Sequence, residues 1–116
     1  MTPEQLKART KKFALDVIVL VSKLPRTLVT EIIGRQLVRC STSVGANYRA
    51  ACRGRSRAEF SAKVAVALEE ADEALYWLEI LRDSGIYSEI SVDVLMSEAD
   101  ALVAIFAASY KTAKSH

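Results

Sequence analysis

Four stretches of this 116-residue sequence repeat apolar residues at alternating steps of three and four. Such spacing places those residues along one face of an α-helix. No stretch shows the apolar–polar alternation of a β-strand, so the chain is predicted to be all-α. The four expected seams are Leu6, Thr10, Phe13, Val17, Leu20 and Leu24; Ile33, Leu37, Cys40, Val44, Asn47 and Ala51; Phe60, Val64, Ala67, Ala71, Ala74, Leu78 and Leu81; and Val92, Leu95, Ala99, Leu102, Phe106 and Tyr110.

Capping and turn residues separate these stretches. Pro25 disfavours a helical conformation at Leu24 and ends the first helix, and the second is expected to run from about Thr27 to Cys52, with Gly54 ending it. Gly85 suits the left-handed position after the third helix. The other helix starts are predicted at a capping box of Thr2 and Gln5, at a capping box of Ser56 and Glu59, and at a cap formed by Ser88 or Ser91.

Short connections force neighbouring helices to run antiparallel, and four apolar seams need one shared core. The sequence therefore predicts an antiparallel up-down-up-down four-helix bundle, formed as a single domain over residues 1–116. No run reaches the roughly 18 apolar residues of a membrane span. The first residues do not form the basic leader and apolar run of a secretion signal. We therefore expect a cytoplasmic protein.

The charges are divided along the sequence. Residues 1–57 carry 12 basic and 3 acidic groups, whereas residues 58–100 carry 2 basic and 11 acidic groups. At about 100° per residue, four arginines of the second helix lie on one face, opposite its apolar seam. Two more arginines continue the basic run through the following turn. The candidate binding residues are Arg35, Arg39, Arg49, Arg53, Arg55 and Arg57.

The third helix carries the matching acidic stripe. Its carboxylates also lie opposite the apolar seam, and two aromatic residues stand beside them as possible interface anchors. The candidate subunit-interface residues are Glu69, Asp72, Glu73, Tyr76 and Trp77, with Asp83 on the same stripe and Glu79 at its margin.

Three interpretations of the arginine stripe are open from the residues alone. Arginine pairs with both phosphates and carboxylates, so the partner is either nucleic acid or the acidic stripe of a neighbouring copy. A basic face and an acidic face on one chain favour head-to-tail contact, which closes into a ring when the rotation permits. The third interpretation is an ordinary solvated face.

Other polar residues suggest structural roles, and no set suggests catalysis. Asn47 is expected to fix the helix register or to contact Ser43, because a buried amide needs a hydrogen-bond partner. Gly34 and Gly45 inside a helix suggest close helix approach. The only histidine is His116, so no nucleophile has a histidine base and no metal-ligand cluster exists. We expect no enzyme activity, no cofactor and no metal.

The two cysteines show no disulfide pattern. Cys40 and Cys52 fall on one predicted helix, about 18 Å apart at 1.5 Å per residue. A disulfide needs Cα atoms within roughly 7 Å. Both are expected to be small apolar packing residues.

Several short motifs resemble a known bacterial family. They are Leu24-Pro25, Gln36-Leu37 with Arg39, Thr42-Ser43-Val44-Gly45-Ala46-Asn47, Arg53-Gly54-Arg55-Ser56 and Glu59-Phe60, followed by Glu70, Glu73 and Leu78 to Leu81. This pattern is similar to that of the four-helix-bundle proteins encoded in intervening sequences of 23S ribosomal RNA genes. The accessory variability proteins of diversity-generating retroelements look related to the same group.

The resemblance implies a four-helix bundle that forms a homopentameric ring, and it implies nucleic-acid binding through a basic surface for the retroelement branch. One departure is Tyr48-Arg49-Ala50-Ala51, where the family usually has Ile-Ala-Glu-Gly. This loss of an acid and gain of Arg49 makes the second helix more basic. The positions that carry over are Ser43, Asn47, Arg53, Arg55, Ser56, Glu59 and Phe60.

Together these observations favour a non-enzymatic, ring-forming accessory protein whose basic second helix contacts RNA or DNA. The alternative is an oligomeric scaffold that binds only protein, with the arginines used in ion pairs between subunits.

Overall fold

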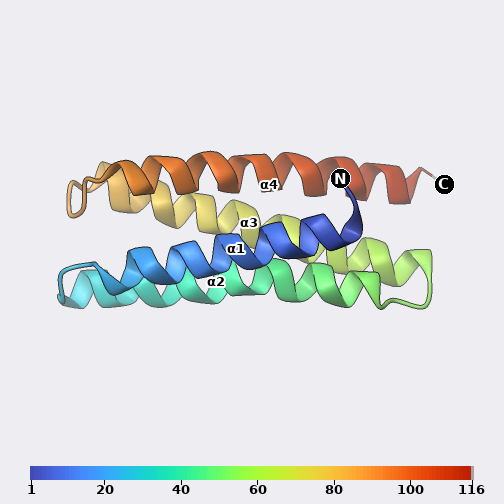
Figure 1. Cartoon of the computed structure of the whole chain (residues 1–116), viewed down its shortest axis with the longest axis horizontal. Coiled ribbons are helices and arrows are strands. Elements are labelled where there is room, and N and C mark those ends of the chain that lie inside the picture. Colours follow the sequence, from blue (N-terminus) through green and yellow to red (C-terminus); the bar gives the residue numbers. More distant parts are fainter. Residues whose placement is uncertain (116) are drawn as a thin grey trace.

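The computed structural model describes residues 1–115 and contains four helices, which run up and down along one axis (Figure 1). They occupy a body of 46 × 21 × 19 Å. No strand occurs in the described residues. The predicted all-α four-helix bundle is confirmed. The helices are α1 (Pro3–Ser22), α2 (Leu28–Cys52), α3 (Arg57–Asp83) and α4 (Ile90–Lys114).

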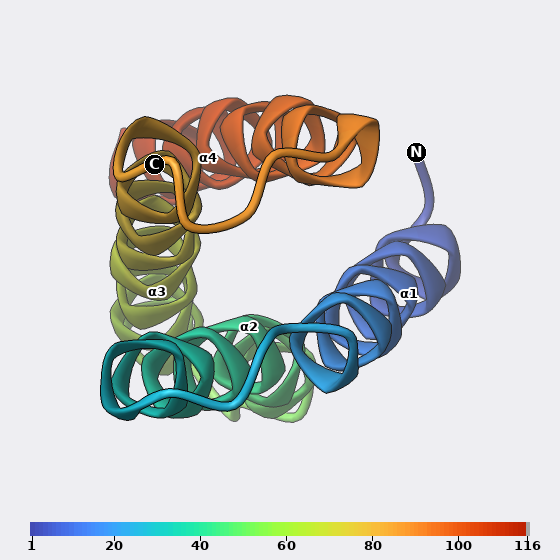
Figure 2. The ribbon, with the colours of Figure 1, turned by 90° about the vertical axis from the view of Figure 1, so that its left-hand side faces the viewer.

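The helices stand at four corners in chain order (Figure 2). The α2 helix packs on α1 and α3, and α3 also packs on α4, whereas the backbones of α1 and α4 approach least and those of α2 and α4 lie diagonally across the core without close approach. The α1–α2 and α3–α4 turns share one end of the bundle, which we call the double-turn end (Figure 1). The α2–α3 turn lies with both termini at the other end, which we call the terminus end.

The core follows the predicted seams, with Phe60 and Tyr110 half-buried against it and one departure on α2. Asn47 is only half-buried, and Tyr48 takes the core position instead, with 5% of its surface exposed. The Tyr48 ring packs against Phe106, with centroids 5.6 Å apart. The prediction that Asn47 lies in the seam was wrong because the buried row of α2 steps by four from Val44 to Tyr48 and then by three to Ala51.

Most predicted helix ends agree with the structure. Thr2 and Gln5 form the predicted capping box, and Gly85 has the predicted positive φ of 73°. The start of α4 was predicted wrongly, because Glu89 is its N-cap and makes no side-chain capping bond. The two serines proposed for that role stand on either side of it: Ser88 precedes the cap, and Ser91 already lies inside the first turn.

Two glycines allow α1 and α2 to approach closely, as expected. A Cβ atom added at Gly45 would stand 3.1 Å from Thr10 Oγ1, and one at Gly34 would stand 3.0 Å from Val21 Cγ1. Both distances are shorter than ordinary van der Waals contact. The two glycines therefore mark two close contacts along the same seam, one in each half of the bundle.

Candidate nucleic-acid interface

The four arginines of α2 do not form a single surface. All four side chains are exposed, but the structure gives them three different settings. Arg39 contacts α3, Arg49 and Arg53 line a groove against α1, and Arg35 borders a hollow at the double-turn end. Each setting therefore has its own chemistry.

Arg39 pairs with two carboxylates of the same chain. One guanidinium nitrogen lies 3.1 Å from Glu70 Oε2, and the other donates to Glu73. The hydrogen bond to Glu73 and the charge of Glu70 raise the pKa of Arg39. Glu70 was absent from the predicted acidic stripe because it faces α2 and is largely covered. An ion pair within the chain thus takes up Arg39 and Glu73.

A basic groove runs between α1 and α2 toward the terminus end. It has a volume of about 620 Å³ and, between its charged residues, a floor of small residues: Gly45, three alanines and two threonines. The predicted residues Arg49 and Arg53 line its α2 wall. The α1 wall supplies two lysines that the sequence interpretation did not select. The four cations of this basic groove are Lys7, Lys11, Arg49 and Arg53.

The basic groove is strongly positive and mostly unpaired. Lys7 pairs with Glu4 at 3.2 Å, and Glu4 is the one carboxylate of the lining, which leaves a net charge of +3 from four cations and one anion. Within residues 1–115, the side chains of Lys11, Arg49 and Arg53 make no hydrogen bond or ion pair. Each wall presents its cations four residues apart, so successive turns of both helices point into the same channel.

The remaining predicted arginines lie outside the basic groove. Arg55 and Arg57 are exposed, in the turn before α3 and at its first residue. Arg57 also lines a separate hollow between the start of α3 and the end of α4. They extend positive charge around the terminus end without joining the four cations.

The predicted structural polar residues all make local bonds. The Asn47 amide donates to the carbonyl and the hydroxyl of Ser43, at 2.8 and 2.9 Å. Ser56 caps α3 by accepting from the Glu59 backbone N–H at 3.1 Å. The Glu59 carboxylate accepts from the backbone N–H of Arg55, at 2.7 Å, rather than from that of Ser56, so the predicted capping box of Ser56 and Glu59 is only half formed. These bonds shape α2 and the α2–α3 turn beside the basic groove.

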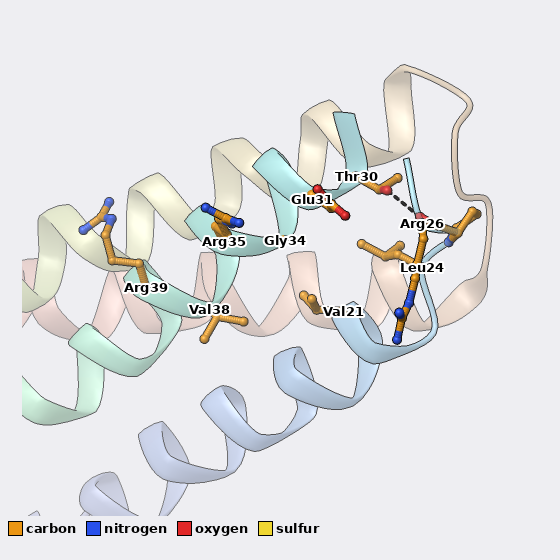
Figure 3. A pocket seen from close by; sticks show the side chains of 10 residues that line it. Val21, Leu24, Arg26, Thr30, Glu31, Gly34, Arg35, Val38 and Arg39 are labelled. Atoms are coloured by element: carbon orange, nitrogen blue, oxygen red, sulfur yellow. Dashed lines mark hydrogen bonds between the residues drawn. The ribbon is translucent and has the colours of Figure 1, made fainter. Parts of the chain in front are cut away.

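A second hollow lies beside α2 at the double-turn end (Figure 3). It has a volume of about 580 Å³ and combines an apolar base with charged edges. Figure 3 shows Arg35 one helical turn from Arg39, and Thr30 donating its hydroxyl to the Pro25 carbonyl. The base includes Val21, Leu24 and Val38, and the edges include Arg26, Glu31, Arg35 and Arg39.

The predicted interface residues of α3 divide into exposed side chains and side chains that pack within the chain. Glu69, Asp72 and Tyr76 are exposed, and the Tyr76 ring meets Trp77 edge-on at a centroid distance of 5.5 Å. Trp77 is half-buried against the core, and its buried indole N–H has no partner within residues 1–115. Trp77 therefore packs within its own chain, whereas Tyr76 stays accessible.

No catalytic or metal centre emerges from the described part of the chain. Residues 1–115 contain no group of three His, Cys, Asp or Glu side chains placed to hold a metal, and His116 lies outside those residues. Cys40 and Cys52 are both free thiols. Burial raises the pKa of Cys40 to about 12, so this thiol is protonated and unreactive near neutral pH. None of the helices in residues 1–115 has the length and apolar character of a membrane span.

Fold and surface together define a small four-helix bundle that carries a basic groove between its first two helices. The family of 23S rRNA-intervening sequence proteins matches residues 5–108, and the chain belongs to this family. A crystal structure of a protein of unknown function from the S23 ribosomal protein family of Bacteroides thetaiotaomicron is similar. It is 29% identical, with a TM-score of 0.83 over 96% of this chain and 99% of that chain. A comparison with curated proteins finds no match.

Proposed function

We propose that this chain is a non-enzymatic accessory protein that forms a homopentameric ring in the cytoplasm and binds RNA or DNA through the basic groove. The observation that carries the binding proposal is the meeting of Lys7, Lys11, Arg49 and Arg53 in one channel, three of them without a partner. Unpaired cations that converge from two helices are costly to hold together, so a polyanion in the channel stabilises them.

The chemistry of the basic groove suits a phosphate backbone. Arginine reaches phosphate oxygens with two parallel hydrogen bonds, and lysine adds compact positive charge. The lining offers no aromatic platform for stacking bases. Binding is therefore expected to be tolerant of sequence and sensitive to salt.

The ring proposal has two supports. The family resemblance implies a pentamer, and the chain carries basic and acidic faces that can mate head to tail. A ring would present five copies of the basic groove, and simultaneous engagement of several would strengthen binding to a long strand without any new contact. The family name itself refers to the gene location, so it does not identify the nucleic acid.

A matched pair of charge reversals tests the binding proposal. Arg49→Glu with Arg53→Glu removes two groove cations, whereas Lys111→Glu with Lys114→Glu makes the same change of charge on exposed residues of α4. Fluorescence anisotropy with labelled single-stranded RNA and duplex DNA would follow binding at several salt concentrations. The groove variant should bind far more weakly and lower the log–log salt slope by about 2, one for each lost phosphate contact.

The control variant should lower nucleic-acid affinity only slightly, because it changes the electrostatic potential of the whole protein but no cation of the basic groove. Equal losses in the two variants would mean that binding is diffuse and that the basic groove has no special role. A wild-type protein that ignores both nucleic acids at low salt would contradict the binding proposal.

A wild-type protein that binds neither RNA nor DNA would favour the second candidate, an oligomeric scaffold that contacts only protein. The pairing of Arg39 with Glu70 and Glu73 supports this candidate, because it shows that arginines of α2 do meet carboxylates. The apolar character of the double-turn end supports it as well.

A further inference from the structure

The exposed apolar side chains are concentrated at the double-turn end. Nine of the twelve large ones lie in the second half of α1, the first turns of α2, the α3–α4 turn and the first turns of α4. A monomer seldom leaves so much apolar surface together, so this end is expected to be covered by a partner. The nine residues are Leu15, Ile18, Val19, Leu28, Val29, Ile32, Ile86, Ile90 and Val94.

The outward side of α2 begins apolar and continues basic. Leu28 is 74% exposed and Ile32 is 51% exposed. Arg35 follows on the same outward row, and its side chain makes no ion pair or hydrogen bond in the described part of the chain. Figure 3 shows Arg35 on α2 beside the hollow at this end. We call Leu28, Ile32 and Arg35 the α2 junction face.

The outward side of α4 begins apolar and continues acidic, and so complements that of α2. Ile90 is 78% exposed and Val94 is 61% exposed, in the first turns of the helix. Asp93 and Asp100 stand beside them, both exposed and without a salt bridge among residues 1–115. We call Ile90, Asp93, Val94 and Asp100 the α4 junction face. It is apolar first and then acidic, whereas the α2 junction face is apolar first and then basic.

The two faces lie at the same depth of the bundle. Both α2 and α4 start at the double-turn end and run in the same direction (Figure 1). At 1.5 Å per residue, Arg35 lies about 10 Å beyond Leu28, and the two aspartates lie about 5 and 15 Å beyond Ile90. A rotation about an axis parallel to the helices keeps each residue at its depth, so it brings the apolar first turns of α2 to those of α4, and Arg35 to the stretch of α4 that carries the two aspartates.

The diagonal placement of α2 and α4 decides the symmetry of this contact. The two helices meet only through side chains in the core, and their outward sides point to different sides of the bundle (Figure 2). One neighbour therefore cannot cover both junction faces. A two-fold dimer would need both faces on one side, so the contact has to be head to tail.

We propose that the α2 junction face of one copy packs on the α4 junction face of the next copy. This inference rests on the ring formation stated under the proposed function, and it assigns the two surfaces that meet. It also assigns Arg35 to protein contact and leaves the basic groove, at the other half of the α1–α2 seam, open to a phosphate backbone.

Mixing two broken variants tests the proposal. Leu28→Asp with Ile32→Asp spoils only the α2 junction face, and Ile90→Asp with Val94→Asp spoils only the α4 junction face. All four residues are exposed, and circular dichroism would verify that the helices persist. Light scattering coupled to size exclusion should show each variant alone as a 12.8 kDa monomer, in contrast to the larger wild type.

The mixture should give a one-to-one dimer and nothing larger, because the two variants together retain a single intact junction. Variants that stay monomeric when mixed would show that the two faces do not meet each other, which overturns the proposal. Variants that both retain the wild-type mass would overturn the assignment of the surfaces and leave the ring intact. A wild type that is itself monomeric would contradict both this inference and the ring, whereas the anisotropy experiment would still judge nucleic-acid binding by itself.

Discussion

The two halves of the α1–α2 seam differ in what they expose. Toward the terminus end, the seam forms a channel with a small-residue floor and cationic walls, and three of its four cations have no partner. Toward the double-turn end, the same two helices expose leucine, isoleucine and valine, with Arg35 at the border. Polar, unpaired charge suits a hydrated polyanion, whereas apolar surface suits a packed protein partner.

This difference shows why the arginines of α2 should not be treated as one stripe. Because they share one face of α2, the sequence shows only that they point away from the core. Their position along the bundle decides whether they meet lysines of α1, carboxylates of α3 or an apolar surface. The partner of each arginine is therefore a property of the neighbouring helix.

The largest expected difference between the two halves is their response to salt. Four phosphate contacts give a log–log slope of about −3 for a single strand and about −4 for a duplex, so affinity should fall about 50-fold and about 150-fold respectively between 50 and 200 mM salt. An apolar junction should hold over this range, because screening weakens only its charged edge. At matched salt concentrations, anisotropy titrations would measure the nucleic-acid affinity and light scattering would measure the mass of the assembly.

A flat salt response would contradict the phosphate contacts. A ring that dissociates in step with the loss of binding would contradict the comparison itself, because it would mean that one set of charges serves both contacts.

The two glycines should respond differently to the same substitution. An alanine methyl at Gly45 would press on the hydroxyl of Thr10, which is buried, whereas one at Gly34 would press on a methyl group of the half-buried Val21. Alanine gains about 1 kcal/mol in helix propensity, and overpacking costs typically about 1 to 3 kcal/mol. We expect Gly45→Ala to lower the free energy of unfolding by up to about 2 kcal/mol and Gly34→Ala to leave it unchanged or slightly raised.

Urea unfolding of the two variants would measure these free energies. Equal stability would show that the buried Thr10 side chain moves aside as readily as the half-buried Val21 side chain. Because Gly45 also lies on the floor of the basic groove, its alanine variant should weaken nucleic-acid binding as well, and the Gly34 variant provides the control.

The helices could be predicted from the sequence because their signals are local. Apolar periodicity, the capping residues Thr2 and Ser56, and the left-handed Gly85 each act within a few residues of the chain. The errors arose where local signals were weak. A serine before and a serine inside the first turn of α4 were both plausible caps, yet neither makes the capping bond.

The candidate site could be predicted only in part because it depends on pairs of helices. The sequence identifies Arg49 and Arg53 as outward-facing cations, but the register between α1 and α2 decides that Lys7 and Lys11 face them. The spacing of Lys7 and Lys11 by four residues was the available signal. A wheel of one helix likewise could not show that Glu70 of α3 reaches Arg39.

The smallest expected effect is the difference in thermal stability between the alanine variants of Arg39 and Arg35. Arg39 bridges two carboxylates of its own chain but is half exposed, so Arg39→Ala should lower Tm only slightly, and less so in high salt. Arg35→Ala removes no bond within the chain, but on the proposed junction it weakens assembly. The Tm of an oligomer rises with protein concentration. Thermal melts over a range of concentrations should therefore show that Arg39→Ala retains the concentration dependence of the wild type and that Arg35→Ala reduces it. The opposite pattern would place Arg39 in the junction and leave Arg35 as a solvated side chain.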